Sequence, residues 1–299
     1  MTSPIRTILE HVPNAIINIA PERESETRAF LEGTRFELND ELGFGFSASV
    51  DRVIGVPERG VELLWCMSYT LWQRYGDYRR DAQDTVAFSS SLKASLPLLD
   101  WALKNQQAIE RQAWPQGLSR PTGFEVGGEN PRPERVADEL SMCSVGWLLH
   151  HELTHIQRGD SSLVAPAVSR DQERYADRNA TNWLLDQAPE GMALEKRTLG
   201  IATAVICLIA LELENDARWN SLRPHPRATE RLKACLDHPR LRAGAEADLV
   251  AAIGLRLLMD LYHLDPPQRE CETAAEYIAE SCDTIDLALA QGTVSRVST

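Results

Sequence analysis

The chain has 299 residues, of which 43% are hydrophobic and 25% are charged, and its formal net charge at pH 7 is −13. This composition is that of a globular protein long enough to bury a large core, and it argues against intrinsic disorder. The negative charge would repel a phosphate backbone, and no dense cluster of Lys and Arg offsets it, so the composition argues against a nucleic-acid partner.

The termini and the cysteines favour a cytoplasmic protein without a membrane span. The first 26 residues have no apolar run of signal-peptide length. The most apolar stretch, residues 199–211, is shorter than the roughly 20 residues that a bilayer crossing requires. The six cysteines have no CxxC spacing, which favours reduced thiols and predicts no structural disulfides.

The N-terminal third predicts a small sheet followed by two helices. Residues 36–56 alternate apolar and β-branched residues with turn formers between them, which is typical of a hairpin or a meander. Residues 61–75 and 92–109 repeat their apolar side chains at helical spacing.

Residues 111–133 are rich in Pro and Gly and have little periodicity, so we expect a long loop. A loop of this length inside a compact protein is commonly functional. The loop directly precedes the most informative motif of the chain, so it could line a substrate groove. The other interpretation is a plain surface connection, and both stay open.

Beyond Glu134 nearly all of the chain predicts helix, with Gly159 at the end of the first helix and a Ser169-x-x-Gln172 capping box opening the second. We therefore expect a mainly α fold with a small β-sheet (α+β), built as a single domain over residues 1–299. Its parts are a small sheet, a catalytic helical core and C-terminal helices; the ranges are 35–56, 134–237 and 243–291. The helices themselves are expected at about 136–158, 170–187, 192–215, 226–237, 244–263 and 269–290.

Residues 151–155 read HELTH, the HExxH pattern. Residues four apart on a helix lie on one face, so His151 and His155 can bind one metal ion. Glu152 then lies beside the metal without being a ligand, where its carboxylate can take a proton from the attacking water. The alternative is that the pattern arose by chance. The apolar residues Val145 and Leu149 argue against chance, because they predict a buried helix of the kind that an active site needs.

A catalytic zinc ion needs a third protein ligand and an open position. Glu173, 18 residues after His155, opens the next predicted helix and is the candidate. Asp177 lies one turn further on, where it can accept the free ring N–H of a ligating histidine and fix its tautomer. The alternative is that Glu173 and Asp177 form a solvated acidic face.

These motifs carry a family resemblance. HELTH, then ERYAD from residue 173, then HPRATERL from residue 225, resemble the HExxH, ExxAD and HPxxxERL motifs of HtpX-like gluzincin metallopeptidases. The length and the short gap between the first two motifs resemble the phage-exclusion Lit-type peptidases. The resemblance covers about residues 140–235 and implies a gluzincin-like metallopeptidase core with the roles given above.

The same resemblance implies that His225 lines the active site and stabilises the developing oxyanion, with Arg231 pairing nearby. An imidazole donor near the scissile carbonyl is what such a transition state favours. The alternative is that His225 only precedes a helix whose first position is Pro226. Both readings stay open.

The sequence thus predicts a zinc-dependent endopeptidase that hydrolyses a protein or peptide substrate, with phage exclusion or regulatory proteolysis as the setting that the resemblance implies. The rival is a non-catalytic, zinc-stabilised module that binds a partner or regulates it. A structural zinc site would be closed by a fourth side chain, and the sequence offers no obvious Cys or His for it. The sequence does not indicate the oligomeric state.

Overall fold

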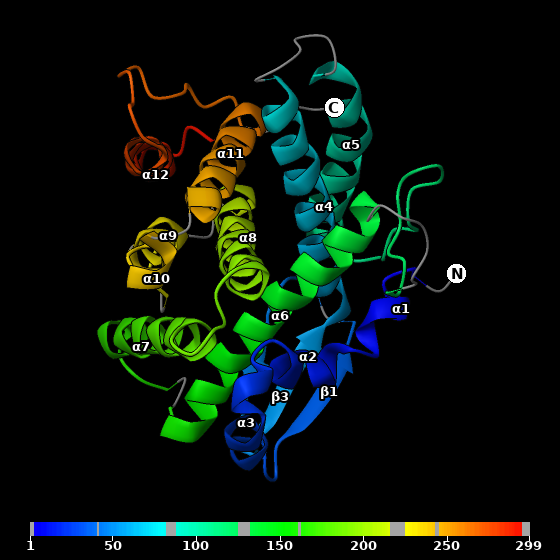
Figure 1. Ribbon diagram of the computed structural model, residues 1–299, viewed down its shortest axis with the longest axis vertical. Coiled ribbons are helices and arrows are strands. Elements are labelled where there is room, and N and C mark those ends of the chain that lie inside the picture. The colour runs from blue at the N-terminus through cyan, green and yellow to red at the C-terminus, as the bar shows by residue number, and fades with distance from the viewer. Residues whose placement is uncertain are drawn as a thin grey trace.

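The computed structural model describes residues 3–40, 42–81, 88–124, 132–160, 163–215, 225–242 and 245–294. The fold is mainly helical with one small sheet, which confirms the expected fold class (Figure 1). No helix in these ranges is long and apolar enough to cross a bilayer.

Four short helical elements precede the sheet, where the sequence predicted none. They are α1 (Arg6–Leu9), α2 (Val12–Asn18), the 3₁₀ helix η1 (Pro21–Arg23) and α3 (Glu24–Phe30). Each spans too few residues for a helical repeat of apolar positions to stand out. Helix α2 packs on α6 (Pro133–Arg158), where a Cβ at Gly146 would lie 2.9 Å from the Ile19 side chain, so a glycine permits the close approach.

The sheet has the strand order β1 (Arg35–Asn39), β3 (Val53–Pro57), β2 (Ser47–Ala48). Strands β2 and β3 form the expected hairpin, but β1 pairs parallel with β3, so a meander is wrong. The segment between β1 and β2 passes to the far side of β3. Ile54 and Val56 of β3 are fully buried, which fixes the central strand on the helical core.

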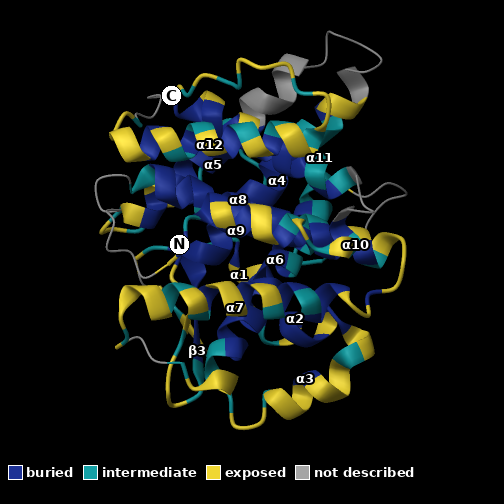
Figure 2. Cartoon of the chain, turned by 90° about the vertical axis from the view of Figure 1, so that its left-hand side faces the viewer, coloured by how far each residue is buried: buried dark blue, intermediate teal, exposed yellow. Residues whose placement is uncertain are grey.

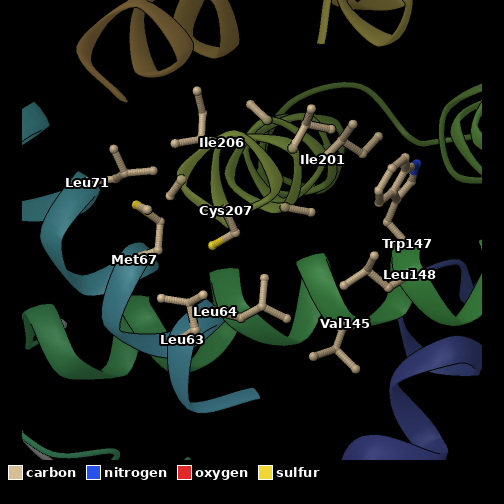
Figure 3. Packing of buried hydrophobic residues seen from close by; sticks show 14 of the residues in the cluster. Leu63, Leu64, Met67, Leu71, Val145, Trp147, Leu148, Ile201, Ile206 and Cys207 are labelled. Atoms are coloured by element: carbon tan, nitrogen blue, oxygen red, sulfur yellow. The ribbon is translucent and has the colours of Figure 1, made fainter. Parts of the chain in front are cut away.

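The core lies among three long helices: α4 (Glu58–Asp81), α6 and α8 (Met192–Glu214). Figure 3 shows leucines and Met67 of α4 facing Ile206 and Cys207 of α8, whereas Val145 of α6 points to the other side of that helix. The backbones of α6 and α8 approach closely at Gly200, whose carbonyl accepts a hydrogen bond from Ser144 Oγ at 2.8 Å. Helix α5 (Phe88–Gln107) packs on α4.

Helix α6 ends at Arg158 and is followed by Gly159 with φ of 65°, the left-handed conformation that glycine adopts without strain. The next helix, α7 (Pro166–Leu185), begins four residues earlier than expected. The predicted Ser169 capping box is therefore wrong: Ser169 lies inside α7, and the fixed φ of Pro166 suits the first turn instead.

Helix α9 (Ala228–Leu236) begins after an extended Arg227, so Pro226 precedes the helix and does not open it. The remaining helices are α10 (Pro239–Arg242), α11 (Ala245–Leu261) and α12 (Ala274–Gln291). Figure 2 shows buried residues concentrated in the central helices and exposed ones on α3 and on the outer faces of α7 and α12.

Candidate active site

The HExxH segment lies on the buried part of α6. Val145 and Leu149 are fully buried in the core, which fixes the rotation of the helix. His151 and His155 then share one face, and their Nε2 atoms are 3.1 Å apart. The two imidazoles therefore point at a common position, as residues four apart on a helix can.

Glu173 on α7 completes a group of three donors. Its Oε2 is 3.3 Å from His151 Nε2, and its Oε1 is 3.4 Å from His155 Nε2. One donor atom from each residue lies within 4.8 Å of the other two. Helix α7 is held on α6 by hydrogen bonds to Thr154 and from Trp147, and this packing brings Glu173 to the histidines.

Asp177 accepts a hydrogen bond from His151 Nδ1 at 2.9 Å. Arg231 of α9 donates to both Asp177 oxygens, at 2.8 and 2.7 Å. Burial raises the pKa of the Asp177 carboxyl, but Arg231 and His151 outweigh burial and hold that pKa below its ordinary value. Glu173 and Asp177 are both buried, so they do not form a solvated face.

A second orienting carboxylate, which the sequence reasoning missed, belongs to Asp160. Its Oδ2 is 3.0 Å from His155 Nδ1, and its backbone N–H donates to the His155 carbonyl oxygen at 3.1 Å. The left-handed turn at Gly159 folds the chain back over the end of α6 and places the carboxylate there. The sequence signal was Gly159, which was read only as a helix end.

His225 lies beside this group, just before α9. Its Nδ1 is 3.1 Å from Glu173 Oε2, and its side chain is 46% exposed. His225 is not among the three residues whose donor atoms lie within 4.8 Å of one another. The structure thus brings all the predicted site residues together; they are His151, Glu152, His155, Glu173, Asp177, His225 and Arg231.

The arrangement suits a metal ion such as zinc. Carboxylates only accept hydrogen bonds, so Asp177 and Asp160 fix the ring protons on Nδ1 and leave each Nε2 lone pair for a metal. Two imidazole nitrogens and one carboxylate are a ligand set of catalytic zinc sites. Burial lowers the pKa of His151, but hydrogen bonds to Asp177 and Glu173 outweigh burial and raise that pKa to about 10, so the two carboxylates stabilise positive charge at this position.

Glu152 is buried and lines a cleft of about 610 Å³. Burial raises the pKa of the Glu152 carboxyl above its ordinary value, although the neighbouring His151 and His155 lower it. A raised pKa makes a carboxylate a stronger base, which suits a group that takes a proton and returns it.

The described residues of the loop predicted at 111–133 are 111–124, 132 and 133, and none of them lines this cleft. Instead Trp114 packs edge-on against Trp65, and Asp138 accepts the backbone N–H of Thr122. Residues 125–131 lie outside the described part of the chain, so the groove-lining reading of that segment stays a prediction.

His150, which precedes the motif, plays a structural part. Its Nε2 is 2.9 Å from the carbonyl oxygen of Ile16 on α2, and burial lowers its pKa to about 3. The neutral imidazole of His150 donates a hydrogen bond to the Ile16 carbonyl oxygen, and this bond joins α6 to the N-terminal helices.

Comparison with known proteins identifies relatives. The family model described as Peptidase U49 matches residues 54–251, a range that contains the whole site. The chain is 31% identical over 280 residues to the "Cell death peptidase" of Escherichia coli strain K12, which covers 88% of this chain and 90% of that protein. No solved structure matches the chain significantly.

Proposed function

Because the chain belongs to the peptidase U49 family, we propose that it is a zinc-dependent peptidase that hydrolyses peptide bonds of a protein substrate. A peptidase family is what the sequence motifs predicted, whereas the gluzincin class and the zinc ion stay predictions. The observation that carries the proposal is the group formed by His151, His155 and Glu173, of which His151 and Glu173 line a cleft.

These three side chains would hold the metal. A zinc ion bound there supplies Lewis-acid chemistry, since it polarises a carbonyl group and acidifies a water molecule. Glu152 takes the proton of the attacking water and delivers it to the leaving amine. The low exposure of Glu152 keeps bulk water from competing for that proton.

The orienting carboxylates provide a first test. We expect Asp160→Ala to weaken zinc binding by about 10–100-fold, because an unoriented imidazole loses the partner that fixes its tautomer. The zinc dissociation constant is measured by competition with a chromogenic chelator. Asp171→Ala is the control, since Asp171 on α7 is 77% exposed and pairs with Arg174 on the surface. Equal zinc affinities for the Asp160 and Asp171 variants would contradict the assignment.

His225 provides a second test. We propose that its imidazole stabilises the developing oxyanion, so His225→Ala should lose about 10²–10³ in turnover. Zinc affinity and KM should change by less than about threefold, as expected for an interaction that forms mainly in the transition state.

His238→Ala is the matched control for His225, because His238 pairs with Asp186 at 3.2 Å on a different part of the chain. His225 also contacts Glu173, so the competing explanation is that His225 positions this metal ligand. If His225→Ala weakens zinc binding and full turnover returns at saturating zinc, His225 positions Glu173 and is no oxyanion donor.

The rival reading is a zinc ion that only stabilises a binding module. In the described residues the donor group has three members and opens onto a cleft, whereas a structural zinc site is closed by a fourth ligand. This favours the enzyme. We propose phage exclusion or regulatory proteolysis as the setting of this activity. The identity of the protein that is cleaved in cells distinguishes the two.

A further inference from the structure

Two side chains at the start of α9 contact the candidate metal site. His225 precedes the helix, and its Nδ1 lies 3.1 Å from Glu173 Oε2. Arg231, within α9, donates to both oxygens of Asp177. The position of the first turn of α9 therefore determines where these two side chains lie relative to the metal donors.

A buried carboxylate on α8 holds the start of α9. Glu212 Oε1 accepts the backbone N–H of Ala228, the first residue of α9, at 3.0 Å. Arg227, which precedes the helix, makes no capping hydrogen bond with its own side chain. The first N–H groups of a helix have no partner within the helix and carry partial positive charge, so a carboxylate is a favourable acceptor for them. Glu212 thus caps α9 from a neighbouring helix.

Glu212 is fixed to the centre of the fold. It lies near the end of α8, it is 3% exposed, and its neighbours Ile209 and Leu213 are buried in the core. The bond to Ala228 therefore joins a core helix to the segment that carries His225. Glu212 and His225 line the same cleft as Glu152, so this bond lies beside the candidate active site.

The segment between His225 and Ala228 is short and stiff. Pro226 is buried, and its ring fixes its own φ and restricts the backbone of His225 to extended conformations. Arg227 is extended as well, with φ of −61° and ψ of 142°. A displacement of the Ala228 amide is therefore passed on to the backbone of His225.

The His225 side chain depends on this segment more than Arg231 does. Arg231 is 8% exposed, and two hydrogen bonds to Asp177 hold its guanidinium group. The His225 side chain is 46% exposed and contacts Glu173 through one ring nitrogen. Side-chain bonds thus fix Arg231, whereas the backbone position largely determines where the His225 imidazole lies.

We propose that Glu212 is a positioning residue of the active site: its hydrogen bond to Ala228 sets the start of α9 and thereby holds the His225 imidazole where it acts on the substrate. The proposal rests on the proposed function, in which His225 stabilises the developing oxyanion. Glu212 acts through His225, so the role requires an acceptor at the reach of a glutamate side chain and does not require a negative charge.

Variants that differ in the acceptor test this role. kcat and KM are measured with the zinc-loaded full chain on a peptide that the wild type cleaves, chosen from a randomised library. Glu212→Met removes the acceptor and should lower kcat at least about tenfold, since a misplacement of about 1 Å can cost about 10²-fold in rate. KM should change by less than about threefold, because the oxyanion contact forms mainly in the transition state.

Glu212→Gln keeps an acceptor oxygen at the same reach and should therefore retain most of the wild-type kcat. Equal losses for the Gln and Met variants overturn the inference, because the negative charge would then be what matters. Glu212→Asp keeps the charge but withdraws the carboxylate by one methylene group. It should also lower kcat at least about tenfold, and it replaces Glu212→Met in the test if the methionine variant does not fold.

A double-mutant cycle separates positioning from a loss of stability. In the His225→Ala background, Glu212→Met should lower kcat by less than about threefold, because the group that it positions is already absent. A purely structural role would give the same loss in both backgrounds, and that result overturns the inference. A His225→Ala variant with wild-type kcat overturns it too, because Glu212 would then have no catalytic group to position.

Asp286 on α12 provides the matched control. Its carboxylate accepts a hydrogen bond from Thr229 at 2.8 Å and pairs with Arg227 at 3.3 Å, so it also holds the start of α9, but it lies outside the cleft. Asp286→Ala removes contacts to side chains and leaves the backbone bond of Ala228 in place, so its kcat should stay at the wild-type value. Equal kcat losses for Asp286→Ala and Glu212→Met overturn the inference.

Zinc affinity shows whether Glu212 positions His225 or Arg231. A displaced Arg231 would release Asp177, and the loss of an orienting partner weakens zinc binding about 10–100-fold. We expect Glu212→Met to keep the zinc dissociation constant of the wild type. A weaker zinc affinity, with full turnover restored at saturating zinc, overturns the role at His225.

Crystal structures test the positioning without turnover. The wild type and Glu212→Met are crystallised under one condition, and the distance from His225 Nδ1 to Glu173 Oε2, which is 3.1 Å in the wild type, is compared. We expect the variant to lengthen it beyond hydrogen-bond distance. An unchanged distance overturns the inference and leaves the peptidase function standing. A displaced His225 in the variant, together with a wild-type chain that cleaves no peptide, supports the positioning and overturns the peptidase function.

Discussion

We expect Glu152→Gln to lose about 10²–10⁴-fold in peptide hydrolysis, the usual contribution of a positioned general base. The amide keeps the shape of the side chain but cannot take a proton. Because Glu152 is not among the three donors of the candidate metal site, zinc content and melting temperature should stay at wild-type values. Turnover is measured on a library of randomised peptides, and zinc content is measured by atomic absorption.

The control for Glu152→Gln is Glu139→Gln. Glu139 lies on the same helix, but it pairs with Arg135 and Lys196 away from the cleft. It should keep wild-type turnover. Equal turnover by wild type and the Glu152→Gln variant would end the proposed mechanism.

The second large effect is expected for Glu173→Ala, which removes one of three donors. Zinc affinity should fall by more than the roughly 10–100-fold that loss of an orienting partner costs. The purified variant should therefore contain little zinc, whereas the wild type should contain about one ion per chain, as one site predicts.

His155→Ala should behave in the same way as Glu173→Ala, because it also deletes one donor of the group. The zinc content of each variant, measured after dialysis, tests both predictions. Near-full occupancy in the Glu173→Ala protein would show that another residue is the third ligand.

The parts of the site that could be predicted from sequence are those fixed by local spacing. Two histidines four apart on a helix must share a face, whatever the rest of the fold does. Glu173 was the candidate third ligand because it opens the next predicted helix, and the motif resemblance implies the same role. The structure places its carboxylate within 3.4 Å of His155.

Asp160 could not be predicted in the same way. Its contact with His155 depends on the left-handed backbone of Gly159, which turns the chain back over the end of α6. The cleft is also a product of tertiary packing, because Gln106, Leu208 and Phe44 are far apart in the sequence and show no common pattern.

The sheet shows a further limit. Alternation of apolar residues predicts strands, but it does not say which strands pair. The parallel pairing of β1 with β3 depends on where the segment from Asp40 to Phe46 crosses the sheet. The boundaries of α7 and α9 were missed because prolines near each helix start allow more than one first turn.

The most direct test of the central claim is to remove and restore the metal while new protein termini are counted. The wild-type chain is stripped with a chelator, divided, and added to a cell lysate with and without one equivalent of zinc. We predict new termini at defined sites only in the zinc-restored sample, and none with zinc-loaded Glu152→Gln. The same termini at the same rate from the stripped protein would contradict a zinc-dependent peptidase.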